Sequence, residues 1–503
     1  MNIKIKLGNF RFTCDNLNPE RLLRLYEKAP QILANYYMEI GGAYLKYVTD
    51  LMGGGIHGTP DKDIIPVNGH DIYNYVARYG NASYQVQMVL RLDGQLDFKK
   101  LREAVMLSVE AEPVLGCRFV EGEIPYWKKI SKVNETCFCS MENTENPGEA
   151  IKKFLNSSLD MDKDPMVKVR LIRTDQKDIV CIKINHACCD GTGAKEYIHL
   201  LAGIYSNIIQ NDGIFIPIPG RRGRIDQDRL FNELGIKDPD SAWVPGSDIT
   251  NPTWNFPWKH GSSSSTSIEV LRLPDNMLEG MKAYARGKDA TINDLILTAY
   301  YRAMLAMGQP EYGTPMEIPI TIDLRRYLPD KKTEAIRNFS GSVATRLSMV
   351  ENEPFIDTLS RVTMMMHEIK GGTPGLQSAI GLERLEKISF WETLAYYQVT
   401  SQYIKKTSQC TPYTGNKCVP TLSNLGYLSN DPIKLGELTV TDACIIPPAV
   451  RAPGFLLVVG TYNEVITLTG AYYEGAASGK DIRKLMGKIR DELAEGCEMQ
   501  RKA

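Results

Sequence analysis

Residues 184–193 have the sequence Ile-Asn-His-Ala-Cys-Cys-Asp-Gly-Thr-Gly, and this stretch decides how the rest of the chain is interpreted. The short apolar run at 179–184 that leads into it is typical of a buried strand. Apolar residues then recur at spacings of three and four from Ala194 to Ile208, which predicts a helix. His186 therefore lies at the end of a strand, before an Asp-Gly turn, where its ring can be held rigidly. We predict that His186 is a general base.

The length and composition are those of an ordinary globular protein. The chain has 503 residues, which favours two or more domains, with 43% hydrophobic and 24% charged residues. A formal net charge of -1 gives no basic field for a nucleic acid, and no run of Lys or Arg indicates a membrane surface. No apolar stretch reaches the roughly 18–20 residues of a transmembrane helix. We expect a cytoplasmic protein with no nucleic-acid partner and no integral membrane segment.

The eleven cysteines are scattered and odd in number, which favours reduced thiols over a disulfide framework. The N-terminus lacks the apolar core of a signal peptide, in agreement with a cytoplasmic location. Cys188 and Cys189 lie beside His186 and leave two alternatives open, a thiol nucleophile or a His/Cys metal site. We favour small buried residues, because both cysteines stand at the variable positions between His186 and Asp190. Cys137 and Cys139 alone are too few for a zinc site, and no other residues complement them at ligand spacing. No metal is expected.

Four parts follow one another along the chain. Residues 1–65 are predicted to be an N-terminal extension, largely helical, that packs on the main body; a partner or lipid interface is the alternative. Residues 66–210 form an N-terminal subdomain of alternating strands and helices that carries the His-x-x-x-Asp-Gly hexapeptide. Residues 211–266 are rich in Pro, Gly and Ser and predict an irregular linker. Residues 267–503 return to strands and helices and form a C-terminal subdomain.

Local signals support this division. In the linker, Arg221, Arg222 and Arg224 form a cluster that could grip phosphate, although a solvated loop is favoured. In the C-terminal part, Thr291 followed by Asp294 predicts a capped helix. Only the N-terminal part carries a His-x-x-x-Asp-Gly sequence, so we expect one active site in the chain.

His186 to Gly191 resembles the His-x-x-x-Asp-Gly motif of the chloramphenicol acetyltransferase-like superfamily. This superfamily includes nonribosomal-peptide condensation domains, plant BAHD acyltransferases, alcohol acetyltransferases and stand-alone polyketide-associated acyltransferases. Further segments are similar to these proteins at matching places: 92–97, 112–119, 291–295, 323–329, 338–341 and 423–426. The resemblance covers roughly residues 66–495, which is nearly everything except the N-terminal extension.

Two departures narrow the resemblance. Peptide-forming condensation domains usually carry two adjacent His residues, and the first of these positions is Asn185 in this chain. The Asp-Phe-Gly-Trp-Gly motif of the BAHD enzymes is absent. Both departures favour a stand-alone acyltransferase that forms an ester or an amide.

The resemblance implies an α/β fold, an α+β sandwich of two acetyltransferase-like subdomains in a V, with an active-site tunnel at their interface. An acyl thioester, carried by coenzyme A or by a carrier-protein phosphopantetheine in trans, would enter from one mouth. A small-molecule alcohol or amine acceptor would enter from the other. No permanently bound cofactor is implied, a monomer would suffice, and secondary metabolism is the expected setting.

The resemblance also implies roles for residues. His186 would be the base, and Asp190 would turn away from it to pair with an Arg, for which Arg325 is the first candidate and Arg326 the alternative. Gly191 would supply backbone freedom after the turn. The tetrahedral oxyanion needs a donor, and the candidates for this role or for substrate contact are Asn338, Ser340 and Asn424.

Two other functions stay open. Some members of the superfamily bind an acyl-pantetheine or a partner protein without acyl transfer, but the intact His186 and Asp190 favour catalysis. An epimerase-like variant would use the same His as a proton shuttle at an α-carbon.

Overall fold

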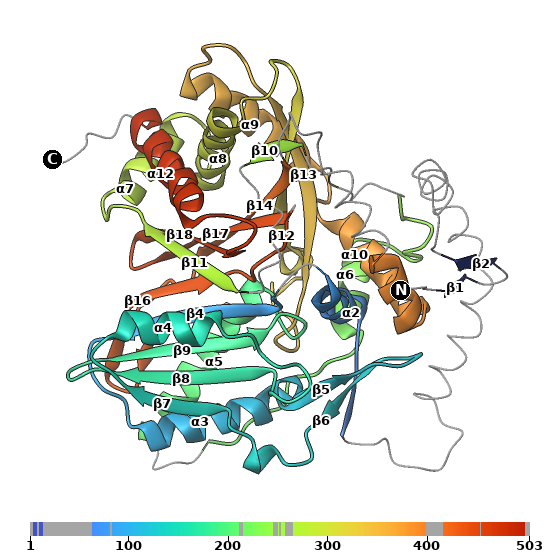
Figure 1. Cartoon of the computed structure of the whole chain (residues 1–503), viewed down its shortest axis with the longest axis vertical. Helices are drawn as coiled ribbons and strands as arrows, with labels where there is room; N and C mark the ends of the chain where they lie inside the picture. Colours follow the sequence, from blue (N-terminus) through green and yellow to red (C-terminus); the bar gives the residue numbers. More distant parts are fainter. Residues whose placement is uncertain are drawn as a thin grey trace.

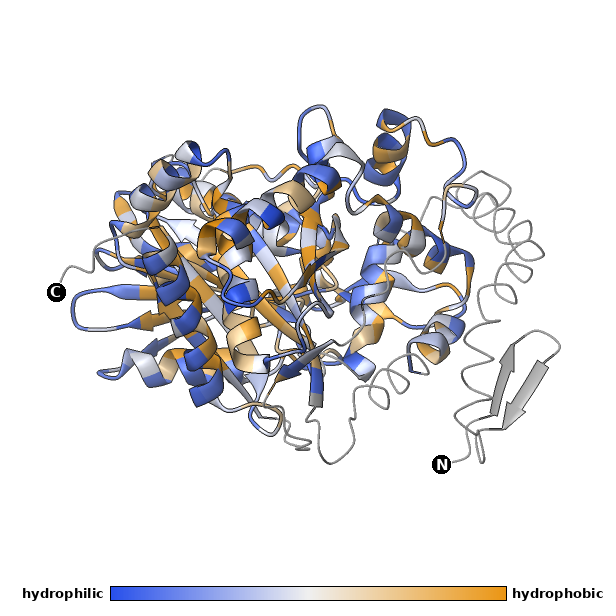
Figure 2. Ribbon diagram, turned by 90° about the horizontal axis from the view of Figure 1, so that it is seen from above, coloured by the Kyte–Doolittle hydropathy of each residue, from blue (hydrophilic) through white to orange (hydrophobic). Residues whose placement is uncertain are grey.

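The computed structural model describes residues 4–7, 10–13, 63–80, 83–210, 215–244, 250, 253–256, 265–398, 416–452 and 454–497. Within these residues, two large sheets with their helices form two subdomains that stack on each other (Figure 1). The predicted α/β class and the two-subdomain arrangement are therefore confirmed. Hydrophobic residues, orange in Figure 2, lie on the strands and on the helices beside them, and the buried ones form two large clusters. None of the described helices is both long and apolar enough to span a bilayer.

The N-terminal subdomain is built on a six-stranded sheet. In spatial order its strands are β15 (Lys434–Leu435), β16 (Leu438–Ile446), β4 (Gln85–Leu92), β9 (Asp178–Asn185), β8 (Val167–Arg173) and β7 (Cys139–Asn143). Strand β9 lies antiparallel to β4 on one side and to β8 on the other, and all 8 of its residues are buried. The apolar residues that β9 carries on both faces are therefore explained by its central place in the sheet.

Helices pack on this sheet and on one another. Helix α3 (Phe98–Ala111) packs on α5 (Gly191–Gln210), and α5 also contacts β4 and β15, while α4 (Pro147–Asn156) packs on β8 and β9. A small three-stranded sheet has the order β3 (Ile64–Pro66), β6 (Tyr126–Lys129) and β5 (Cys117–Val120). Helix α2 (Gly69–Val76) packs on α10 (Leu376–Glu383) and on the 3-10 turn η6 (Arg384–Lys387).

The C-terminal subdomain is built on a seven-stranded sheet. In spatial order its strands are β11 (Thr266–Arg272), β18 (Val465–Tyr473), β17 (Gly454–Tyr462), β14 (Asn416–Tyr427), β12 (Pro315–Asp323) and β13 (Ser340–Ser348), and β10 (Trp254–Phe256) pairs with β14. Its helices are α7 (Met277–Gly287), α8 (Ile292–Gly308), α9 (Phe355–Gly371) and α12 (Gly479–Gly496). Helix α8 packs on both α9 and α12 and begins at the predicted capping box.

The predicted boundary between the subdomains needs a correction. Strands β15 and β16 fall in the range 267–503 that was assigned to the C-terminal subdomain, yet they belong to the N-terminal sheet. Strand β16 pairs antiparallel with β4 from Val440 opposite Leu92 to Ile446 opposite Gln87. The chain therefore crosses back, because the edge of β4 offers backbone hydrogen bonds that an apolar strand can satisfy.

The linker at 211–266 is not irregular throughout, because it contains helix α6 (Ile225–Glu233) and strand β10. Its arginines are used inside the protein. The Arg222 guanidinium donates to the carbonyl oxygens of Cys188 and Ile336, both at 2.6 Å. Arg224 lies 2.7 Å from carboxylate oxygens of Glu383 and of Glu386. The phosphate-binding interpretation of the cluster is therefore wrong for these two residues.

At the N-terminus, the extension begins with strands β1 (Lys4–Leu7) and β2 (Phe10–Thr13), which pair antiparallel. The helices predicted between residues 18 and 52 lie outside the described residues.

Candidate active site

His186 follows directly on β9. Its backbone N–H donates to the carbonyl oxygen of Tyr84 at 2.6 Å, beside the start of β4. Asn185, which stands where condensation domains have their first His, accepts a hydrogen bond from the N–H of Ala187 at 2.9 Å. This side chain thus closes the turn through which the chain leaves the sheet. The central strand and this local turn fix the backbone of His186.

Asn338, which belongs to the C-terminal subdomain, contacts the imidazole of His186. Its side-chain Nδ2 donates to the backbone carbonyl oxygen of His186 at 2.7 Å, and its Oδ1 lies 3.1 Å from His186 Nδ1. Since the amide nitrogen must face the carbonyl, the amide oxygen must face the ring, so Nδ1 is the nitrogen that carries the proton. The other ring nitrogen, Nε2, is then left with a free lone pair.

The ring is also kept neutral. Burial lowers the pKa of His186 below its ordinary 6.5, while the charge of Asp190 and the hydrogen bond with Asn338 act in the opposite direction with less effect. A neutral imidazole near pH 7 follows, and a neutral ring is what a general base requires.

The Asp190 carboxylate turns to the backbone and to Arg325. Its Oδ1 accepts the N–H of Gly193 at 2.8 Å, and its Oδ2 accepts the N–H of Phe339 at 2.7 Å and the Arg325 Nη1 at 3.1 Å. Burial raises the pKa of Asp190, but Arg325 and the two N–H groups outweigh it, so the pKa lies below its ordinary value. Asp190 is therefore an ionised structural group that joins the motif to the C-terminal subdomain.

Arg325 is the centre of this junction and is only 2% exposed. It lies in the 3-10 turn η5 (Leu324–Tyr327) that follows β12. Besides Asp190, its guanidinium contacts Asp323 Oδ1 and Glu196 Oε1, each at 3.2 Å, and donates to the carbonyl oxygen of Arg337 at 3.0 Å. The structure thus places Arg325, and not Arg326, on Asp190.

Gly191 lies close to the side chain of Leu425. A Cβ atom on Gly191 would lie 2.5 Å from Cδ2 of Leu425, which follows Asn424 on β14. Its φ is not among the positive values, so the expected need for backbone freedom is replaced by a need for close packing.

The three candidates for oxyanion or substrate contact are separated by the structure. Asn338 lies on His186, with both polar atoms of its amide engaged there. Ser340 presents its carbonyl oxygen to His70 Nε2 at 3.2 Å. Asn424 donates to Asn293 Oδ1 at 3.2 Å and accepts the N–H of Gly426 at 3.0 Å. Within the described residues, no hydrogen bond joins Ser340 or Asn424 to His186, and their proposed roles stay predictions.

Two contacts at the site were missed from the sequence. His70 is buried on α2 beside Phe339, where burial and then the charge of Arg337 lower its pKa to about 4. Thr192, directly after Gly191, donates from its hydroxyl to Asp323 Oδ2 at 2.9 Å. The contact of Thr192 could have been predicted, because Thr192 directly follows the hexapeptide. Nothing in the local sequence links His70 to the site.

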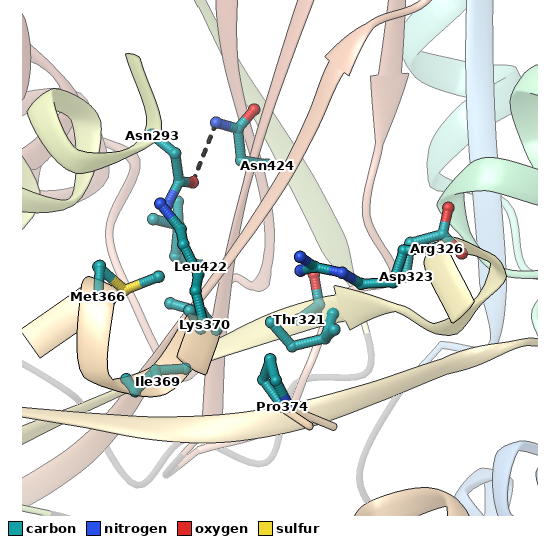
Figure 3. A pocket seen from close by; sticks show the side chains of 12 residues that line it. Asn293, Thr321, Asp323, Arg326, Met366, Ile369, Lys370, Pro374, Leu422 and Asn424 are labelled. Atoms are coloured by element: carbon teal, nitrogen blue, oxygen red, sulfur yellow. Dashed lines mark hydrogen bonds between the residues drawn. The ribbon is translucent and has the colours of Figure 1, made fainter. Parts of the chain in front are cut away.

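A cavity of about 360 Å³ lies beside the motif helix, between β12, β14 and α9 (Figure 3). It is lined by Asn293, Ile320, Thr321, Ile322, Asp323, Arg326, Met366, Ile369, Lys370, Pro374, Leu422 and Asn424. His186 is not among these residues. The link between the cavity and the motif is Asp323, which lines the cavity and accepts a hydrogen bond from Thr192 of the motif. A continuous tunnel from this cavity to the imidazole stays a prediction.

The two cysteines of the motif are completely buried, and burial raises the pKa of both thiols. A thiolate nucleophile at Cys188 or Cys189 is therefore disfavoured. In the part of the chain that the structure describes, no three His, Cys, Asp or Glu residues come together in a way that could hold a metal ion.

Known proteins are similar to this chain in both sequence and fold. The family model described as "Condensation domain" matches residues 77–216, which include the whole motif. Gramicidin S synthase 2 of Brevibacillus brevis is 23% identical over 419 residues, which are 78% of this chain. The chain spans only 9% of that synthase's length.

Two solved structures have the same architecture. The first condensation domain of the calcium-dependent antibiotic synthetase is 16% identical, has a TM-score of 0.61, and the match covers 87% of this chain and 97% of that domain. The trichothecene 15-O-acetyltransferase of Fusarium sporotrichioides is 12% identical, also with a TM-score of 0.61, over 85% of this chain and 95% of that enzyme. The resemblance drawn from the motif is thereby confirmed: the chain has the fold shared by condensation domains and these acetyltransferases, and residues 77–216 match the condensation family.

Proposed function

We propose that the protein is an acyltransferase that moves an acyl group from a thioester to an alcohol or amine, with His186 as general base. The family match and the acetyltransferase fold support an acyltransferase-type or condensation-like role. The observation that carries the finer proposal is the clamp of Asn338 on His186, because it leaves Nε2 as the basic nitrogen of a neutral ring.

The reaction needs one proton to move twice. His186 Nε2 takes the proton of the acceptor hydroxyl or amine as the oxygen or nitrogen attacks the thioester carbonyl. The tetrahedral intermediate then collapses, the C–S bond breaks, and the imidazolium returns the proton to the leaving thiolate. A positioned base of this kind typically contributes about 10²–10⁴-fold to the rate. Asp190 and Arg325 take no part in proton transfer and hold the motif in place.

The proposed co-substrates are an acyl-CoA or an acyl-phosphopantetheine on a carrier protein in trans, with a small-molecule acceptor and no permanently bound cofactor. His186 and Asn338 come from different subdomains of one chain, which supports action as a monomer. A cytoplasmic location and a role in secondary metabolism stay predictions.

Thiol release tests the proposal. The whole chain is incubated with acyl-CoAs of different lengths and a pool of alcohols and amines, and free thiol is measured with and without acceptor. We expect acceptor-dependent release by the native protein and its loss in His186→Ala, whose fold is checked by circular dichroism. Equal release from the native protein and the variant would contradict the proposal.

A non-catalytic module that binds acyl-pantetheine or a partner protein is the second candidate. No release from either protein, together with binding of acyl-CoA, would support this alternative.

A further inference from the structure

The cavity beside the motif is lined by apolar side chains and by three charged ones. Ile320, Ile322, Met366, Ile369, Pro374 and Leu422 supply the apolar wall. Arg326 and Lys370 bring two positive charges, and Asp323 brings one negative charge. Such a lining suits a ligand with an apolar body and one charged end, so the state of each charge decides which sign the ligand carries.

Both carboxylate oxygens of Asp323 are engaged by hydrogen bonds from the motif and from Arg325. Its Oδ1 accepts the backbone N–H of Arg325 at 3.0 Å and the guanidinium of the same residue at 3.2 Å. Its Oδ2 accepts the hydroxyl of Thr192 at 2.9 Å. The Asp323 carboxylate is therefore held on the side of the motif, where it shares Arg325 with Asp190 and Glu196.

Arg326 carries an uncompensated charge. In the described part of the chain it has neither a salt bridge nor a hydrogen-bond partner, and its guanidinium carbon lies 5.7 Å from the centre of the Tyr327 ring. Its side chain reaches from the η5 turn into the cavity (Figure 3). This differs from Arg325 next to it, which is buried and has three carboxylates around it.

Lys370 adds a second cation that is only loosely paired. It lies in the last turn of α9, and its Nζ is 3.7 Å from Asp294 Oδ1, beyond the range of a good hydrogen bond. Its side chain is 39% exposed, so its ammonium group is accessible from the cavity. Asn293 and Asn424, which are hydrogen-bonded to each other, add amide groups to the same lining.

We propose that this cavity binds the anionic end, a carboxylate or a phosphate, of a ligand whose apolar body lies on the Ile320–Ile322 wall, with Arg326 as the principal contact. An arginine fork offers two parallel N–H donors to either group. The identification of this ligand as a co-substrate rests on the proposed acyl transfer, whereas the binding itself does not.

The test measures binding without turnover. Octanoate, octyl phosphate and uncharged octanamide are titrated into the whole chain by isothermal calorimetry. We expect the two anions to bind more tightly than the amide, and Arg326→Gln to weaken both anions about tenfold or more while leaving octanamide unchanged. The matched control is Arg286→Gln, an exposed arginine of α7 outside the cavity, which should bind like the native protein.

The outcomes separate this proposal from the acyltransferase proposal. Equal binding of octanoate and octanamide, or unchanged binding in Arg326→Gln, overturns the anion site whatever the activity. His186→Ala should retain octanoate binding even though it loses turnover. Where turnover is measured, a higher KM of Arg326→Gln for an acyl-CoA but not for the acyl-pantetheine assigns the anion to the donor phosphate. A higher KM for a carboxylated acceptor but not for its methyl ester assigns the anion to the acceptor.

Discussion

At the scale of single residues, the site depends on an amide that orients an imidazole. Asn338→Ala removes both hydrogen bonds to His186 and frees the ring to take the other tautomer. We expect kcat to fall about tenfold to hundredfold with KM little changed, as for other groups that orient a functional His. The matched control is Asn74→Ala, which deletes one amide–carbonyl bond on α2 and should keep its kcat.

The pH profile gives the same variant a second readout. Activity needs the neutral ring, so it is lost as pH falls through the pKa of His186, which lies below 6.5 in the native protein. The hydrogen bond with Asn338 raises that pKa, and its loss should move the acid limb to lower pH. An unshifted limb together with unchanged kcat would show that Asn338 does not act on the ring.

The charged pair behind the motif is predicted to stabilise the protein. Arg325→Gln leaves the buried Asp190 carboxylate without its cation, which costs roughly 3–5 kcal/mol in the free energy of unfolding. Arg272→Gln breaks the more exposed pair with Asp442 and should cost no more than about 1 kcal/mol. Urea unfolding at pH 7 measures both values, and equal costs would contradict the structural role of Arg325.

The same pair has a defined pH dependence. The pKa of Asp190 is lowered in the folded protein, so its contribution to stability is fully present above the ordinary value of 3.8 and is lost as pH falls through the folded pKa. The difference between the native protein and Arg325→Gln should therefore shrink below about pH 4.

The residues of the site were only partly predictable. The spacing of His186, Asp190 and Gly191 within one hexapeptide carries a local signal, and the Arg that follows a predicted strand at 325 carries another. Asn338 is predicted only as one of three candidates for oxyanion or substrate contact, because no local pattern shows that a residue 152 positions away will face the imidazole. The pairing of β12 with β13, together with the contacts of Arg222 and Asp190 to residues 336–339, brings that segment back to the motif.

At the scale of elements, the start of α5 is packed against the end of β14. Gly191→Ala would place its Cβ 2.5 Å from Cδ2 of the half-buried Leu425 side chain, which must then leave its rotamer, so we expect a loss of about 0.5–1.5 kcal/mol in the free energy of unfolding. In a protein that already carries Leu425→Ala, adding Gly191→Ala should cost less stability than it costs in the native protein. If the double variant loses as much stability as the two single variants together, the two residues do not compete for space.

Elements with strong local chemistry were predicted well. The capping box at Thr291 and Asp294 marks the start of α8. The sequence also predicts strands at 455–462 and 465–472 joined by a hairpin at Asn463 and Glu464, and the structure has this hairpin between β17 and β18. Both turn residues of that hairpin have positive φ. Helix α6 was missed, because the Pro- and Gly-rich composition around it outweighed nine residues without a clear apolar period.

At the scale of the whole molecule, β16 comes from the C-terminal half of the chain but belongs to the N-terminal sheet. We therefore expect the two subdomains to unfold together. The hydroxyl of Tyr462 in β17 donates to the carbonyl of Val440 in β16 at 2.8 Å and accepts the N–H of Ile433 at 2.9 Å. We expect a single calorimetric transition in the native protein and a loss of about 1–3 kcal/mol in Tyr462→Phe. Two separate transitions in the native protein would contradict this unity.

The pairing of β16 with the N-terminal sheet was not predictable from the sequence. The apolar residues within 438–446 are compatible with a strand, but such a pattern does not show which other strand it pairs with. The family resemblance implied two subdomains, and their division was drawn where the composition changes at residue 267. The structure joins them by a strand that lies about 170 residues beyond that boundary, where composition carries no signal.

The most direct test of the central claim is the ratio of kcat/KM for His186→Ala and the native protein, measured by thiol release across pH 5 to 9 on the best donor and acceptor. We predict a fall of about 10²–10⁴-fold at pH 7 and the disappearance of the acid limb in the variant. A variant that retains the native rate and the native pH profile would show that His186 is not the base.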